Sequence, residues 1–131
     1  MKMEGFAHVG LYVNDIQKSL NFYVGVLGFE LEWESVNQCP EGDVLVKFIR
    51  SGDSMIELVQ FPYPIERQDG WFDHIALKVE DIDGVIAELE KKGIAFEEGT
   101  YTHALQTFPG GSKWIMFRGP DQEHIELNER L

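Results

Sequence analysis

Two hydrophobic periods alternate along the chain. Between residues 6 and 13 every second residue is apolar, which is the period of a β-strand. The spacing then changes to four, three and four residues, the period of one helix face, at Ile16, Leu20, Tyr23 and Leu27. Asp15 stands where a helix N-cap is expected, and Gly25 or Gly28 can end the helix. The pattern therefore predicts a strand followed by a helix.

Three strand-like runs follow this helix, and the same order of elements returns in the second half. The runs cover residues 30–35, 44–49 and 55–61, then 95–98, 113–117 and 124–128. The second helix has Asp83 as its expected cap, Glu88 and Lys92 as an i,i+4 pair, and Gly93 as its end. Its apolar stripe consists of Ile82, Val85, Ile86 and Leu89. Each half is predicted to be β-α-β-β-β.

The two halves also repeat in sequence. Residues 6–16 match residues 72–82 at an offset of 66, with six of eleven positions identical. Phe48 and the run 56–58 recur as Phe117 and 125–127 at an offset of 69. Two prolines and a glycine in residues 62–70 mark the seam. We expect one domain, residues 1–131, built from a first module at 4–62 and a second module at 70–129.

Composition and charge exclude several classes of protein. The 131 residues carry 11 basic and 23 acidic side chains, a net charge of −12, which excludes a basic nucleic-acid binder. A hydrophobic content of 44% is typical of a packed globular chain. A single cysteine, Cys39, and an N-terminus without a continuous apolar run predict a cytoplasmic location. No apolar run approaches the ~20 residues that span a bilayer, so we expect no membrane association.

The strand period brings four metal-binding side-chain types to equivalent positions of the repeat. Apolar neighbours on each side must face the helices, so the residues between them project from the opposite face. Those residues are His8, Glu57, His74 and Glu126. Two imidazoles and two carboxylates gathered on one face are costly without a cation, whereas a divalent ion gives a neutral site. Such a set suits Zn, Ni, Co, Mn or Fe, and the sequence does not choose among them.

At these residues the sequence resembles the vicinal oxygen chelate superfamily, over residues 4–129. The resemblance is carried by residues 8–15, 22–29, 73–79 and 119–127. It implies an α+β fold in which two paired βαβββ modules form a curved mixed sheet around a metal site. The ligand order His, Glu, His, Glu is similar to that of glyoxalase I (lactoylglutathione lyase). Methylmalonyl-CoA epimerases usually carry Gln second, and fosfomycin-modifying enzymes and extradiol dioxygenases use His, His and Glu.

The resemblance also implies roles for these residues. His8, Glu57, His74 and Glu126 would bind one divalent metal, with Glu126 as the catalytic base and Glu57 as a second proton carrier. The implied reaction converts the hemithioacetal of an α-oxoaldehyde and a thiol, such as glutathione, into a 2-hydroxyacyl thioester through an enediolate. A homodimer is implied as well. Its sites lie either within one chain or between His8 and Glu57 of one chain and His74 and Glu126 of the other.

Substrate recognition departs from the glyoxalase I pattern. Tyr12 occupies the position of an arginine that holds a glutathione carboxylate, and Phe61 replaces a common asparagine. Lys78, Arg118 or the amides of Gly110 and Gly111 are the alternative anion donors. The candidate substrate-binding residues are Tyr12, Phe61, Lys113, Trp114 and His124. Packing in the core or in a dimer is the competing interpretation for the aromatic residues, and a plain glycine turn is the competing interpretation for residues 109–113.

Two other functions stay open at this stage. One is a metalloenzyme of the same superfamily with different chemistry, either a thiol transferase of the fosfomycin-modifying kind or an epimerase. The other is a protein that sequesters a hydrophobic drug such as bleomycin without catalysis. The complete His, Glu, His, Glu set argues against the second, because drug-sequestering members usually lack it. We therefore expect a glyoxalase I-like lyase.

Overall fold

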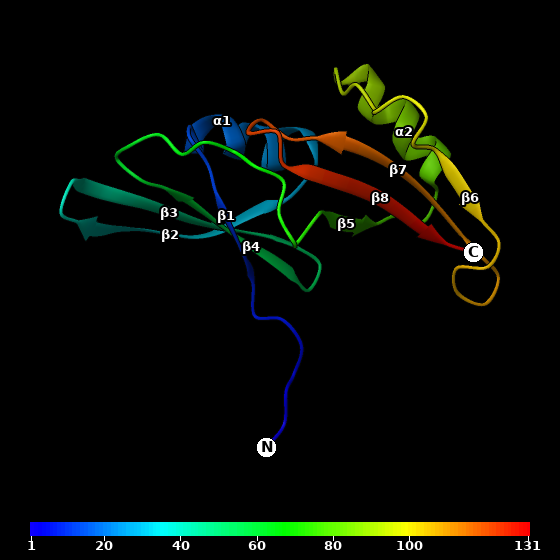
Figure 1. The fold of residues 1–131 in the computed structure, drawn as a ribbon, viewed down its shortest axis with the longest axis horizontal. Helices are drawn as coiled ribbons and strands as arrows, with labels where there is room; N and C mark the ends of the chain where they lie inside the picture. The colour runs from blue at the N-terminus through cyan, green and yellow to red at the C-terminus, as the bar shows by residue number, and fades with distance from the viewer. The chain divides into compact units, whose positions relative to one another are not determined.

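The computed structural model describes all residues, 1–131, and the chain divides into two compact units, Met1–Glu66 and Arg67–Leu131. Each unit holds one four-stranded sheet (Figure 1). The first unit contains β1 (Val9–Tyr12), α1 (Ile16–Leu20), η1 (Asn21–Val26), β2 (Glu30–Cys39), β3 (Gly42–Ser51) and β4 (Ser54–Gln60). The second contains β5 (Ile75–Lys78), α2 (Ile82–Lys91), β6 (Thr102–Ala104), β7 (Ser112–Arg118) and β8 (His124–Arg130). The βαβββ order and the α+β class are confirmed in both units.

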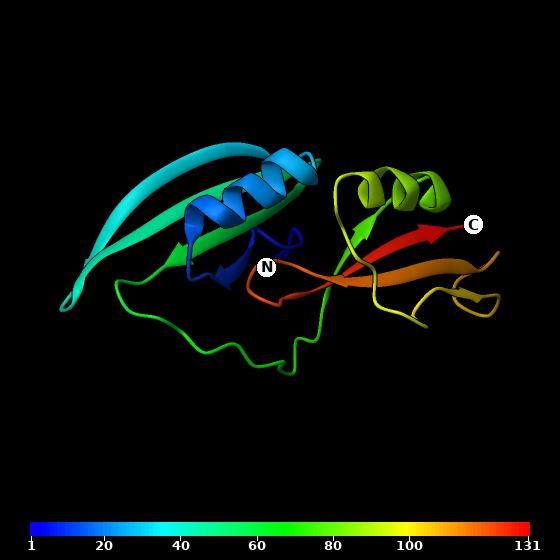
Figure 2. The ribbon, with the colours of Figure 1, turned by 90° about the horizontal axis from the view of Figure 1, so that it is seen from above.

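The two sheets share one topology. Their strand orders are β1-β4-β3-β2 and β5-β8-β7-β6, and in each the first pair is parallel while the other pairs are antiparallel. Helical segments lie along one face of each sheet, α1 with η1 in the first unit and α2 in the second (Figure 2). No helix is long and apolar enough to cross a membrane.

The buried face of each sheet follows the predicted alternation. Ile56 and Leu58 on β4 are buried, as are Ile125 and Leu127 on β8. Packing of these side chains beneath the helices leaves the residue between each pair on the other face. The positions of the two glutamates thus depend on which side chains form the core.

The N-cap of the first helix is the predicted residue, whereas that of the second is not. The Asp15 side chain caps α1 by accepting from the Lys18 amide at 3.1 Å. In α2 the cap is Asp81, which accepts from the Gly84 amide at 3.2 Å, so the prediction of Asp83 was wrong. The helix begins at Ile82, which is fully buried, so Asp81 rather than Asp83 occupies the N-cap position. Asp83 lies in the first turn instead.

The other predicted features of the two helices have mixed outcomes. The Glu88–Lys92 pair is present at 3.8 Å, and Gly93 ends α2 with a φ of +92°. The first helix changes after Leu20 into the π-helical turn η1, which the sequence did not predict. Its chain then turns at Gly28, whose φ is +82°.

One predicted strand is wrong and several bounds differ. Residues 95–98 form only an isolated bridge between Phe96 and Phe117, and the strand is instead β6, which follows four residues later. The chain turns after residue 97, because the Glu97 carbonyl accepts from the amide and the hydroxyl of Thr100. β2 continues as far as Cys39, and β3 begins at Gly42. Near this turn the Gln38 side chain donates to Asp43 at 2.6 Å. β1 begins at Val9, so His8 directly precedes it.

The repeat also needs a correction between its third strands. Phe48 pairs with Glu57, whereas the residue that pairs with Glu126 is Met116 rather than Phe117. Phe117 pairs with Ile125 and is fully buried. The hairpin that precedes β8 is longer than the one that precedes β4, which shifts the offset by one residue. Phe48 therefore corresponds to Met116.

Substitution of Leu127 by Ala tests the division between the two sheet faces. Leu127 is 2% exposed, so Leu127→Ala should lower the free energy of unfolding by about 2–5 kcal/mol through lost burial and a cavity. Leu105, which is 73% exposed, gives the matched control, and Leu105→Ala should change the stability by less than about 0.5 kcal/mol. Urea denaturation of both variants measures the difference, and equal losses would contradict the assigned core.

Candidate functional site

The first unit brings one histidine and one glutamate together. His8 stands directly before β1, Glu57 lies in β4, and His8 Nε2 is 3.6 Å from Glu57 Oε1. Gly10, the register partner of Glu57, has no side chain, and a Cβ there would lie 3.7 Å from the carboxylate. The His8 ring also packs edge-on against Phe48, with ring centroids 5.4 Å apart. This face of the sheet therefore carries a His–Glu pair.

The second unit repeats the pair. His74 directly precedes β5, Glu126 lies in β8, and His74 Nε2 is 3.4 Å from Glu126 Oε1. The Glu126 side chain is 11% exposed, compared with 28% for Glu57. The two pairs occupy equivalent positions of the repeat, and the second carboxylate is the more enclosed.

Neighbouring side chains orient the second pair. Asp73 Oδ2 lies 2.9 Å from His74 Nδ1, which fixes the proton there and leaves Nε2 as a lone-pair donor. Asn128 Nδ2 donates to Glu126 Oε2 at 2.8 Å and leaves Oε1 toward His74. The hydrogen bond with His74 also lowers the pKa of Asp73, so this carboxylate is charged at neutral pH. A carboxylate behind a histidine is the arrangement found in metal-binding sites.

The donor chemistry of the two pairs fits a divalent metal. Two ligands ~2.1 Å from one ion at a tetrahedral angle lie about 3.4 Å apart, close to the His–Glu separations in both units. The same separations are too long for strong hydrogen bonds within the pairs. No group of three or more His, Cys, Asp or Glu side chains placed for a metal is present in residues 1–131. Each unit therefore holds one imidazole and one carboxylate, donors of the kind that divalent metals take.

A second polar cluster lies beside His74. The His124 ring centroid is 6.2 Å from that of His74, and its Nε2 is 3.0 Å from Glu97 Oε1. Both ring nitrogens of His124 are buried without an aligned hydrogen bond, so its contacts with Glu97 and Asp73 are electrostatic. His124 shares the Glu126 face of β8, as expected from the strand period.

Arg118 holds this cluster in place. Its guanidinium donates to Asp69 at 2.8 and 3.3 Å, to Glu97 at 3.0 Å and to the Gln122 carbonyl at 3.0 Å. The Arg118 hydrogen bond lowers the pKa of Asp69, and Asp69 in turn raises the pKa of Arg118. Arg118 is therefore occupied and does not serve as the anion donor considered from the sequence.

The remaining candidate residues lie in different places. Tyr12 and Phe61 contact edge-to-face with centroids 5.2 Å apart in the first unit. Trp114 pairs with Asn128 and so shares the Glu126 face, whereas Lys113 pairs with Glu129 on the helix side. Lys113 lies 3.9 Å from Asp83 in α2 and is not brought together with Glu126.

Sequence reasoning missed three residues around the second pair, Asp69, Asp73 and Asn128. Asn128 follows Glu126 by two positions in the strand and Asp73 adjoins His74, so alternation and adjacency were usable signals. The Arg118–Asp69 contact joins residues 49 apart and has no local signal.

A stability measurement tests the Asp69–Arg118 pair. Because the pKa of Asp69 is below its ordinary 3.8, its charged form stabilises the fold above that pH and the contribution disappears as the pH falls through the lowered value. Asp69→Asn should therefore be less stable than the parent at pH 7 and equal to it in strong acid. Urea denaturation from pH 7 to pH 2 checks this, with Asp53→Asn in the β3–β4 turn as the control. A pH-independent deficit would contradict the ion pair.

Comparison with known proteins identifies the family of the chain. The model of the Glyoxalase/Bleomycin resistance protein/Dioxygenase superfamily matches residues 5–127. YwkD of Bacillus subtilis is 32% identical over 99% of this chain and all of its own length. Lactoylglutathione lyase of Salmonella typhimurium is 33% identical, covering 93% of this chain and 90% of that protein.

Solved structures agree. A glyoxalase family protein from Enterococcus faecalis has a TM-score of 0.75 at 31% identity, covering 98% of this chain and 100% of that one. FosX from Listeria monocytogenes, a fosfomycin resistance protein complexed with Mn(II), shares the fold with a TM-score of 0.71 at 18% identity over 99% of this chain and 95% of that one. With the repeated βαβββ unit and a match over nearly its whole length, the chain belongs to the glyoxalase/bleomycin resistance/dioxygenase superfamily.

Proposed function

We propose that this chain is a glyoxalase I-like, metal-dependent lyase. It would convert the hemithioacetal of an α-oxoaldehyde and a thiol into a 2-hydroxyacyl thioester. The observation that carries the proposal is the His–Glu pair that occurs once in each unit, at 3.6 and 3.4 Å. The carboxylate in both pairs favours this reaction, because the isomerisation needs a proton acceptor beside the metal.

One divalent ion would be held by both pairs together, His8 with Glu57 and His74 with Glu126. The ion is Zn, Ni, Co, Mn or Fe, and when bound it would stabilise negative charge on the substrate oxygens. The proposal applies equally if the two pairs come from one chain or from two chains of a homodimer. We also propose that the protein is a cytoplasmic homodimer and that it binds a small-molecule substrate.

Glu126 is the proposed base. Its carboxylate takes the proton from the carbon that bears the sulfur and returns it to the adjacent carbon. The hydroxyl proton passes to the neighbouring carbonyl oxygen, so the reaction is an isomerisation with no net change in atoms. Asn128 holds Glu126 Oε2 and thereby orients the carboxylate. Asp73 holds the His74 ring in the matching orientation. The more exposed Glu57 is the proposed second proton carrier.

Reloading with metals tests the activity. Metal-stripped protein would be supplied separately with Ni, Co, Zn and Mn and given the methylglyoxal–glutathione hemithioacetal, and the thioester absorbance would be followed. Turnover that returns with metal is the expected result. Metal binding without turnover, together with thiol addition to fosfomycin or epimerisation of methylmalonyl-CoA, would replace the proposed activity by one of those reactions.

Glu126→Gln separates proton transfer from metal binding. The amide oxygen still faces the metal but cannot accept a proton, so turnover should fall by about 10²–10⁴-fold while a metal stays bound. Glu98→Gln, an exposed change of the same kind in the same unit, should keep full activity. Steady-state kinetics and metal analysis of both variants give the answer. Unchanged turnover in Glu126→Gln would remove Glu126 as the base.

Tyr12→Arg tests the choice of thiol. If the missing arginine limits the use of glutathione, the new guanidinium should lower the KM for the glutathione hemithioacetal by about tenfold through a charged hydrogen bond to a carboxylate. Tyr12→Gln removes the ring contact with Phe61 without adding charge and serves as the control. Equal KM values for both variants would show that Tyr12 does not decide the thiol.

A further inference from the structure

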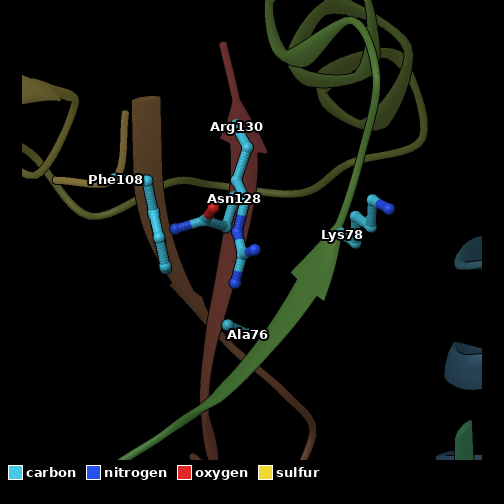
Figure 3. A pocket seen from close by; sticks show the side chains of 5 residues that line it. All are labelled: Ala76, Lys78, Phe108, Asn128 and Arg130. Atoms are coloured by element: carbon cyan, nitrogen blue, oxygen red, sulfur yellow. The ribbon is translucent and has the colours of Figure 1, made fainter. Parts of the chain in front are cut away.

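A cavity of about 380 Å³ opens between β5, β8 and the loop that follows β6 (Figure 3). Its lining is Ala76, Lys78, Phe108, Asn128 and Arg130. All five residues belong to the second unit. The lining carries two positive charges and no carboxylate, in a protein whose net charge is −12.

The cavity adjoins the proposed base. Ala76 is the register partner of Glu126 in the β5–β8 ladder. Asn128, two residues further along the same strand face, donates to Glu126 Oε2. A molecule that reaches Glu126 from this side therefore has another group inside the cavity.

Arg130 is the principal cation of the cavity. Figure 3 shows its side chain running back along β8 toward Ala76. Its guanidinium carbon lies 3.7 Å from the centroid of the Phe108 ring. Within residues 1–131 no carboxylate pairs with Arg130, although Arg50 and Arg118 are both paired. The guanidinium keeps donors for an incoming acceptor, and its planar fork matches an oxyanion.

The loop after β6 holds the Phe108 ring in a fixed position against Arg130. Phe108 has a φ of +65°, a strained value for a bulky residue that persists only where the surroundings fix it. The Gly111 amide donates to the Phe108 carbonyl at 3.1 Å, and the Leu131 amide donates to the Gly111 carbonyl at 3.0 Å. The first bond closes the loop on itself, and the second ties the loop to the residue that follows Arg130. Stacking on a fixed ring reduces the freedom that Arg130 loses on binding.

We propose that this cavity binds an oxyanion of the substrate, a carboxylate or a phosphate, with Arg130 as its main ligand. The inference rests on the proposed function and narrows the substrate to an acid. Its charged group would lie in the cavity while its reacting carbon lies at Glu126. The second hydrogen on Asn128 Nδ2 is a further donor, since only one is used by Glu126. Lys78 adds charge at the rim, and its amine points away from Arg130 in Figure 3.

The test is direct binding of small anions to the full metal-free chain, which needs no catalytic turnover. Inorganic phosphate and lactate would be titrated separately while ¹⁵N NMR follows the Arg130 Nε–H, the Asn128 side-chain amide and the Ala76 backbone amide. Saturable shifts at these three positions are expected with at least one of the two anions. The anion that binds more tightly identifies the group as a phosphate or a carboxylate.

Variants distinguish the cavity from the general surface. Arg130→Gln should raise the Kd by about tenfold or more, the effect of losing a charged hydrogen bond, and Arg130→Lys should raise it less. Arg67→Gln, which removes the same charge from an exposed arginine of the same unit, should leave the Kd unchanged. Equal Kd values in the parent and Arg130→Gln, or shifts that do not saturate, would overturn the proposal. Because no step uses the hemithioacetal, loss of the proposed lyase activity would leave this result intact.

Discussion

The two-residue period of a β-strand is the constraint on which the proposed site depends. Leu58 and Leu127 must be buried beneath the helices, and this fixes Glu57 and Glu126 on the opposite faces of their sheets. A register slip of one residue would place a carboxylate in the apolar core, at a cost of several kcal/mol. The same packing that stabilises each unit thus positions the glutamate of its His–Glu pair.

The two pairs are equivalent in sequence but not in their surroundings. Glu126 is enclosed and held by Asn128, and His74 is backed by Asp73, whereas the first pair is more exposed. An oriented, enclosed carboxylate suits the proposed catalytic base, because a base must hold a fixed position relative to the carbon that loses its proton. The repeat therefore provides two His–Glu pairs that differ in exposure and in the side chains that hold them.

Alternation and internal repetition predicted the fold class and paired the histidines with the glutamates, because both signals are local. The errors arise where distant parts of the chain decide. The length of the hairpin before β8 places Met116 instead of Phe117 opposite Glu126. The hydrophobic pattern of a strand does not predict the length of the turn that joins it to the next strand. Asp81 rather than Asp83 is the cap because the helix begins at Ile82, which is buried and donates its amide to Glu129 in β8. The Asp69–Arg118 contact depends on how residues 49 apart meet.

Charge links the proposed metal site to the cavity beside it. An excess of twelve negative charges favours a cation at the four ligands and opposes the approach of an acidic substrate. If a divalent ion neutralised two of these carboxylates, the charged side chains lining the adjoining cavity would be Arg130 and Lys78. An anion is then attracted to this end of the strand and repelled from most of the remaining surface. A protein of this charge can bind an acid only where an arginine is kept free of its own carboxylates, and stacking on Phe108 satisfies that condition for Arg130.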